Sequence, residues 1–201
     1  PVPAMVARAR LRAEQADVPL SVMLGDANAL AYADDTFDVV VALGVLPWLE
    51  DPHQALREMA RVTQPGGYVL VTTDNLARLH SFFDPWLNPG TAWLRRVTKV
   101  ALTSGGLYRP SGRSLGARLH SRKYTDEALC DAGLTKLRGA TVGFGPFTIF
   151  RHPVLPAKSS VELHLRLQRL ADRQAPVLRA TGSQYVVLAH KPRKPVDDHR
   201  V

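Results

Sequence analysis

The stretch GDANALAYADDTFDVVVALGVLPWLEDPHQALREMARVTQPGGYVLVTTDN, residues 25–75, decides the fold of this chain. Within it, Phe37–Leu43 is apolar except for Asp38 and rich in β-branched residues, which predicts a strand buried on both faces of a parallel sheet. The run Asp51–Gln54 (DPHQ) places an N-cap, a proline and a glutamine where a helix begins. Tyr68–Thr73 predicts the next strand. This alternation of strand, helix and strand indicates a layered α/β sheet.

Further elements are expected on both sides of this stretch. The residue patterns predict helices at Pro3–Ala16, from a cap at Thr125 to just before Gly133, and at Ser159–Arg173. They predict strands at Leu20–Leu24, Leu134–Phe144 and Gln184–Ala189. Residues 76–107 are expected to be helical in pieces, because prolines interrupt them. The whole pattern predicts one α/β domain over residues 1–191, followed by a loose tail at 192–201.

Three motifs in a fixed order carry a family resemblance. They are GDA at Gly25–Ala27, FDVV at Phe37–Val40 and PGG at Pro65–Gly67. With this order and spacing the chain resembles the class I S-adenosylmethionine-dependent methyltransferases, in particular the type 11 group. The resemblance holds in element order from Pro3 to Lys191 and is residue-specific only over residues 25–75. It implies a Rossmann-like sheet, mostly parallel with an antiparallel last strand, a methyltransferase activity, and S-adenosyl-L-methionine as the cofactor.

The resemblance also implies which residues lie beside the cofactor. Asp26 stands where the family places an acid that accepts a hydrogen bond from the adenine amine, and the Ala27 backbone lies beside it. Asp26 can also be interpreted as a turn or cap residue. The ligand interpretation is preferred because ligands of α/β sheets bind at the carboxyl ends of strands. Ala42, Leu43 and Gly44 leave the following strand at that end, and Gly44 permits close approach of a ligand.

Part of the pattern that the family implies is absent from this sequence. The first strand, the glycine-rich loop and the ribose-binding acid would all precede Pro3. The chain also begins with Pro1 rather than methionine, so we expect an N-terminally truncated chain, either a fragment or a processed product. The principal cofactor contacts therefore cannot be assigned. We expect this chain to bind S-adenosylmethionine weakly. Even if the full-length enzyme is active, whether this chain alone is active stays an open question.

Candidate substrate contacts follow the same strands. Trp48 has an aromatic face of the kind that attracts cations such as a sulfonium, although a core tryptophan is as good an interpretation. Asn75 follows Asp74 at the end of its strand, on the expected ligand side. The stretch Gly143–Phe147 is expected to add a wall to the acceptor pocket.

Methyl transfer depends largely on in-line positioning, and an oxygen nucleophile usually also needs a general base. The candidates are His53, His80, His120 and Tyr124, but none has a sequence neighbour that distinguishes it from an ordinary surface residue. The catalytic residue therefore stays unknown. The seven histidines are scattered and Cys130 is the one cysteine, so the sequence predicts no metal site and no internal disulfide.

Positive charge is concentrated in one segment. The chain has a formal net charge of +8, and the interval between Asp84 and Asp126 holds eight Lys or Arg residues and no acid. Charge runs are usually solvated surfaces, but the tryptophans and phenylalanines nearby favour an anionic or lipid-like partner. Trp86 and Arg95 are predicted to contact the substrate, within a lid expected at residues 76–123. No nucleic-acid-binding module is visible, so a nucleic-acid partner is not expected.

These observations predict a methyltransferase for a small-molecule or lipid-like acceptor, and the basic segment favours an anionic acceptor or membrane surface. The protein is expected to be cytoplasmic and able to associate peripherally with a membrane. Two alternatives stay open. A non-catalytic methyltransferase-like partner, or pseudoenzyme, fits the truncated start. A nicotinamide-dependent Rossmann oxidoreductase is less favoured, because neither a G-x-G-x-x-G loop nor a Tyr-x-x-x-Lys pair occurs.

Overall fold

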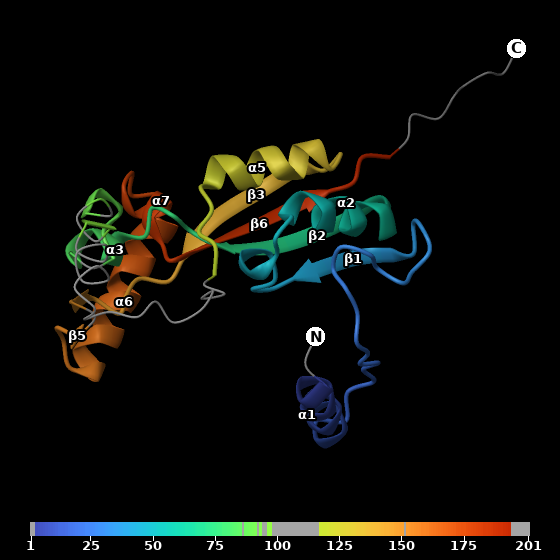
Figure 1. Cartoon of the computed structure of the whole chain (residues 1–201), viewed down its shortest axis with the longest axis horizontal. Helices are drawn as coiled ribbons and strands as arrows, with labels where there is room; N and C mark the ends of the chain where they lie inside the picture. The colour runs from blue at the N-terminus through green and yellow to red at the C-terminus, as the bar shows by residue number, and fades with distance from the viewer. Residues whose placement is uncertain are drawn as a thin grey trace, which may run out of the picture.

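The centre of the molecule is a four-stranded sheet in the order β1-β2-β6-β3 (Figure 1). The structure is a computed structural model that describes residues 3–85, 87–91, 93, 96–97, 117–150 and 152–193. The four strands are β1 Phe37–Ala42, β2 Thr63–Asp74, β3 Thr135–Val142 and β6 Gln184–His190. β1 and β2 are parallel, whereas β6 lies antiparallel between β2 and β3. The predicted sheet, mostly parallel with an antiparallel last strand, is confirmed.

One face of the sheet is covered by α2 (Pro52–Val62) and α5 (Arg122–Asp131). The residues buried there come from both layers, among them Leu56, Leu129, Val69, Val71 and Val187. The predicted helix start at Asp51 is confirmed, because its side chain accepts a hydrogen bond from the Gln54 N–H at 3.1 Å.

The cap of α5 differs from the prediction. Ser121, not Thr125, caps this helix by accepting a hydrogen bond from the Tyr124 N–H. Thr125 is buried inside the helix, with its hydroxyl oxygen 3.4 Å from that of Thr73 on β2. The Thr125 hydroxyl, four residues after the cap, therefore helps to dock α5 on the sheet.

The opposite face of β1 is open, so the prediction that this strand is buried on both faces was wrong. Val39 and Val41 are 54% and 52% exposed, and Tyr68 on β2 is 44% exposed. Alternate side chains of a strand point to opposite faces, and both α2 and α5 lie on the other face of the sheet. These three side chains consequently form an apolar surface in the described part of the chain.

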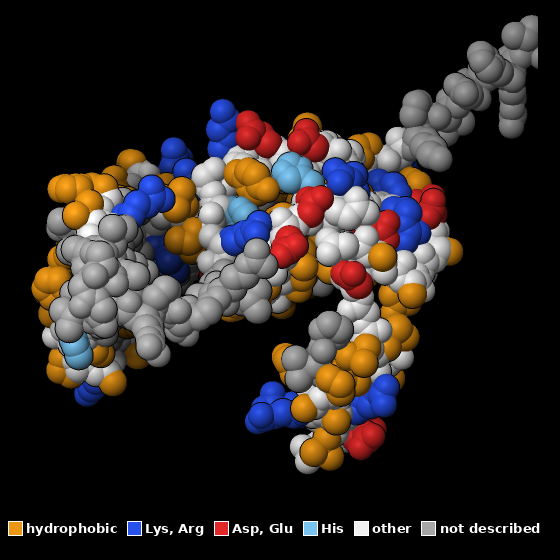
Figure 2. All heavy atoms as spheres, in the orientation of Figure 1, with side chains coloured by type: hydrophobic (Ala, Val, Ile, Leu, Met, Phe, Trp, Pro, Cys, Tyr) orange, Lys and Arg blue, Asp and Glu red, His pale blue; other side chains and the backbone are white. Residues whose placement is uncertain are grey.

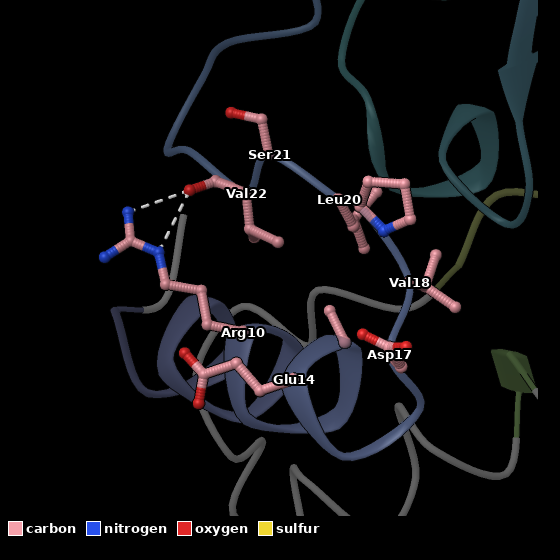
Figure 3. Close-up of a pocket in the computed structure, with 9 residues that line it drawn as sticks. Arg10, Glu14, Asp17, Val18, Leu20, Ser21 and Val22 are labelled. Atoms are coloured by element: carbon pink, nitrogen blue, oxygen red, sulfur yellow. Dashed lines mark hydrogen bonds between the residues drawn. The ribbon is translucent and has the colours of Figure 1, made fainter.

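The segment after α1 (Pro3–Gln15) also differs from expectation, because Leu20–Leu24 is not a strand. A strand needs a neighbour for its backbone groups, and here the Val22 carbonyl instead accepts two hydrogen bonds from the Arg10 guanidinium, at 2.8 and 3.1 Å. Figure 3 shows this segment folded back over α1, where the two line a hollow of about 470 Å³. The segment is therefore held by a side chain of α1 rather than by the sheet.

A second lobe lies beyond the carboxyl end of β2 (Figure 1). Its elements are α3 (Leu79–Phe83), η2 (Pro89–Thr91), β4 (Thr148–Ile149), β5 (His152–Pro153), α6 (Ala157–Asp172) and α7 (Leu178–Thr181). Hydrophobic side chains gather on this lobe, whereas acidic and basic side chains mix over α2 and α5 (Figure 2). None of the helices in the described ranges combines the length and apolar character that crossing a bilayer requires.

Candidate functional site

Asp26 lies in a tight turn. Its carbonyl accepts the Ala29 N–H at 3.2 Å, and its Oδ1 atom accepts the Asn28 N–H at 2.9 Å. The Asp26 side chain is nevertheless exposed. Asp26 is thus a turn residue through its Oδ1 atom. A ligand contact would use the other carboxylate oxygen, Oδ2.

This turn lies at the carboxyl end of β1, where a ligand of an α/β sheet is expected. The Asn28 carbonyl accepts a hydrogen bond from Gln54 Nε2, which belongs to the first turn of α2. Because α2 follows β1 and packs back along the sheet, its first turn marks that end. Ala27 and Val45 both pack against the same core.

The bend that leaves β1 offers a close approach to its backbone. Gly44 has a φ of +65°, a conformation that favours glycine, and a side chain there would meet no atom within 4 Å. Its N–H donates a 2.7 Å hydrogen bond to Thr72 Oγ1, which fixes the bend. Leu43 is 64% exposed, whereas Ala42 is buried in the core. Leu43 and Gly44 are therefore accessible at this edge, whereas Ala42 exposes no side chain there.

Trp48 is not a core residue. Its side chain is 62% exposed at the end of η1 (Leu46–Trp48), while Leu46 and Pro47 beside it are buried. This exposure removes the core interpretation of Trp48 and leaves the contact with substrate or sulfonium as a proposal. Arg118 lies along the same segment, since its N–H donates to the Pro47 carbonyl and its guanidinium to the Glu50 carbonyl.

Asn75 has a structural task. Its Nδ2 atom donates to the carbonyls of Ala180 and Gly182, at 2.9 and 2.8 Å, and its Oδ1 atom accepts the Ala77 N–H. The residue is 1% exposed. Both amide protons are used in holding the α7–β6 connection against the end of β2, so Asn75 has no donor left for a substrate.

Three of the candidate bases form one aromatic cluster between α2 and α5. The His120 ring stacks on Tyr124 with centroids 4.9 Å apart, and the His53 ring meets Tyr124 edge-on at 5.4 Å. Burial, and secondarily Arg118, lower the pKa of His120. The cavity beside this cluster measures about 10 Å³, room for one water molecule at most. A substrate therefore cannot reach His120 through it.

His80 lies apart from that cluster, on α3. It is 8% exposed, and its Nδ1 atom lies 3.4 Å from the hydroxyl oxygen of Ser183. Burial and the nearby charge of Arg78 lower the pKa of His80, so the imidazole stays neutral at neutral pH. In the described residues no group of three His, Cys, Asp or Glu side chains could hold a metal ion.

An apolar cavity of about 420 Å³ opens in the second lobe. Its lining consists of large apolar side chains from α3, the β4–β5 hairpin and α6, chiefly Leu79, Phe83, Phe147, Ile149, Leu163 and Leu167. The rings of Phe83 and Phe147 meet with centroids 5.9 Å apart. The Thr148 hydroxyl in this wall donates to the buried carboxylate of Asp84. The wall expected from Gly143–Phe147 is thus present through Phe147, whereas Phe144 is buried.

That α6 closes this cavity could not be predicted, because Leu163 and Leu167 follow an ordinary helical spacing. Two predicted substrate contacts, Trp86 and Arg95, lie outside the described residues, as does 98–116 of the expected lid.

Residues 1–71 match the family described as a methyltransferase domain. The first third of the chain is therefore similar to methyltransferase domains. One methyltransferase relative, a malonyl-[acyl-carrier protein] O-methyltransferase of Halorhodospira halophila, is 41% identical over 88 residues. That match covers 44% of this chain and 30% of the relative. A demethylmenaquinone methyltransferase of Renibacterium salmoninarum is 38% identical over 78 residues, covering 39% of this chain and 31% of the relative.

A solved methyltransferase structure matches over nearly the whole chain. It is described as a SAM-dependent methyltransferase, possible histamine N-methyltransferase, of Thermotoga maritima, with a TM-score of 0.55 and 18% identity. The match covers 95% of this chain and 70% of that structure. At this identity the likeness establishes the methyltransferase fold and not the reaction. The chain spans less than a third of the two methyltransferase relatives named above.

Proposed function

We propose that this chain serves S-adenosylmethionine-dependent methyl transfer to a lipid-like acceptor. The observation that carries the proposal is the apolar cavity of about 420 Å³ in the lobe beyond the carboxyl end of β2. Its volume lies within the range of small-molecule sites, and its lining suits a hydrocarbon chain rather than a polar metabolite. The two relatives named above act, by their names, on a malonyl-acyl-carrier protein and on demethylmenaquinone.

On the cofactor side, Asp26 would accept a hydrogen bond from the adenine amine. The Ala27 backbone would lie beside the ring, and the exposed Leu43 and the open face of Gly44 would lie against it. The bound cofactor supplies an electrophilic methyl group. The task of this chain is then to orient the two reactants and exclude water, which is how positioning accelerates such a transfer.

The need for a base depends on the acceptor atom. A carboxylate is already ionised at neutral pH and needs none, whereas an enol or phenol has to lose a proton. We propose His80 as the base in the second case, because burial keeps its imidazole neutral. Trp48, Trp86 and Arg95 remain proposed acceptor contacts, and residues 1–191 remain proposed as one domain whose lid is 76–123.

Saturation-transfer NMR with S-adenosylhomocysteine tests the cofactor side, since it detects weak binding. We expect the adenine protons to receive more saturation than the methionine protons, and Asp26→Ala to remove this signal. An unchanged signal in Asp26→Ala would take Asp26 out of the site.

The acceptor side is tested with a series of straight-chain acyl thioesters. Each buried methylene contributes about 0.8 kcal/mol, so affinity should rise about fourfold per methylene until the cavity is full. Phe83→Ala should flatten this dependence. Phe82→Ala is the matched control, because Phe82 neighbours Phe83 but does not line the cavity. Equal effects of the two variants would refute the assignment. Transfer of a labelled methyl group to the free carboxylate of a dicarboxylic thioester of the best-bound chain length then tests catalysis itself.

A further inference from the structure

A second cavity, of about 360 Å³, lies at the outer edge of the sheet. Three arginines from three different elements line it: Arg122 at the start of α5, Arg138 on β3 and Arg179 on α7. Figure 1 shows α5 above β3, and α7 beyond the end of that strand. These arginines, far apart in the sequence, converge because β3 is an edge strand on which α7 packs.

The three guanidinium groups have no acidic partner in the described part of the chain. None of them lies within 4.0 Å of a described carboxylate, whereas Arg61 on α2 contacts both Glu58 and Asp34. Asp172 is the one acid among the described residues that line the cavity, and its Oδ1 atom already accepts a hydrogen bond from Gln168. Three positive charges and one negative charge leave the cavity with a net charge of +2.

This charge and shape favour a particular class of ligand. A phosphate monoester carries close to two negative charges at neutral pH and offers three terminal oxygens. Guanidinium groups bind phosphate oxygens in a two-pronged geometry, and three of them carried by three different elements suit a tetrahedral group better than a planar carboxylate.

We propose that this arginine pocket, defined by Arg122, Arg138 and Arg179, binds a phosphate monoester. The site is separate from the Asp26 turn and from the apolar cavity, so it extends beyond the proposed methyl transfer. It also lies close to the apolar cavity. Leu167 on α6 lines that cavity, and Ala171, one helical turn or about 6 Å further along, lines the arginine pocket. The phosphate could therefore belong to a water-soluble ester or to the head of an amphiphile.

The test measures binding of inorganic phosphate to the full chain by calorimetry and thermal shift, at constant ionic strength and with acetate for comparison. We expect phosphate to bind more tightly than acetate. Arg138→Gln and Arg179→Gln should each weaken phosphate binding about tenfold, because a hydrogen bond between charged groups is lost. Arg166→Gln is the matched control, since Arg166 is an exposed residue of α6 that does not line the pocket.

Two further readouts keep the proposal testable if an arginine variant folds poorly. Asp172→Asn keeps an oxygen for Gln168 and should tighten phosphate binding about threefold, because it removes the one negative charge. Without phosphate, Arg138→Gln should melt no lower than the wild type, since it relieves repulsion between like charges.

The source of the phosphate is distinguished by comparing octyl phosphate with glycerol phosphate. If octyl phosphate binds more tightly than glycerol phosphate, and Leu167→Asn removes this difference, the ligand is the head of an amphiphile. If the two compounds bind equally, the ligand is a water-soluble ester. The proposal is overturned if phosphate does not bind, or if Arg166→Gln weakens it as much as Arg138→Gln does. It is equally overturned if only anionic vesicles bind, since the arginines would then belong to a membrane-facing surface. None of these measurements needs the cofactor or a methyl acceptor, so failure here and failure of the proposed function are separable.

Discussion

Replacing Glu58 by glutamine should loosen the segment that carries the candidate adenine contact. Glu58 Oε2 accepts the Leu30 N–H at 2.9 Å, and both of its oxygens accept hydrogen bonds from Arg61. Arg61 in turn donates to the carbonyls of Leu30 and Tyr32. This pair on α2 therefore ties down residues 30–32, which directly follow the Asp26 turn.

The size of the effect follows from the pKa of Glu58. Hydrogen bonding from Arg61, and then from the Leu30 N–H, lowers this pKa to about 2. Relative to an unfolded value of about 4.3, the shift corresponds to at most about 3 kcal/mol at 1.36 kcal/mol per unit. Because the Arg61 side chain is 31% exposed, solvent screening reduces the expected contribution to about 2 kcal/mol.

The sign of the pH dependence is fixed by the same shift. A carboxyl whose pKa is depressed in the folded state contributes its full stabilisation above the unfolded pKa, and this is lost as the pH falls toward about 2. Urea unfolding followed by circular dichroism should therefore give a deficit of about 2 kcal/mol for Glu58→Gln at pH 7, shrinking to about 0.5 kcal/mol near pH 2.5. Glu162→Gln, an exposed change on α6, is the control. A deficit of equal size at pH 7 and pH 2.5 would refute the ionic origin of this stabilisation.

Three other substitutions and titrations test the structure. Gly44→Ala should cost about 1 kcal/mol in unfolding free energy, because alanine is strained at positive φ, and its methyl group should weaken S-adenosylhomocysteine binding in the NMR experiment. Asn75→Ala should cost about 2–3 kcal/mol, because it leaves one buried and one part-buried carbonyl without donors, and thermal unfolding measures this. The pKa values of His80 and His120, followed by NMR, should both lie below the ordinary value of about 6.5. Acidification below pH 6.5 should therefore destabilise the fold, since the unfolded chain binds these protons more readily.

Local sequence rules predicted the sheet well, because each strand carries its own signal. The apolar run at Phe37–Leu43 became β1, and the helix start at Asp51 is made by bonds to residues three positions away. The antiparallel last strand followed from the family resemblance and is confirmed by its pairing with β2 and β3.

The predictions that failed depended on distant partners. Leu20–Leu24 has the composition of a strand, but Arg10 binds its backbone. Val39 and Val41 are as apolar as core residues, but they are exposed. The sequence of a strand does not determine which of its faces a helix will cover. Asn75 was predicted to contact substrate because it ends a strand on the expected ligand side. Its actual partners, two carbonyls 105 and 107 residues further along the chain, could not be seen from the local sequence.

The arginine pocket could not be predicted from sequence patterns for the same reason. The arginine pocket joins side chains whose positions in the sequence have no common spacing, and only the packing of α7 on β3 brings them together. By contrast, Phe83 and the stretch ending at Phe147 were identifiable as aromatic residues outside the sheet, and they meet in the apolar cavity.

The position of β6 has a consequence for how the protein is made. β6 is synthesised after the other three strands, yet it lies between β2 and β3 in the sheet. Asp74 of β2 and Val142 of β3 both pair with Gln184 of β6, so neither can pair until β6 has been made. Until β6 emerges, β2 and β3 each present an unpaired edge, which is a template for association with other chains. A nascent chain halted before Gln184 should therefore be a substrate for chaperones, and the second lobe gains its fixed place only when translation has passed the final strand.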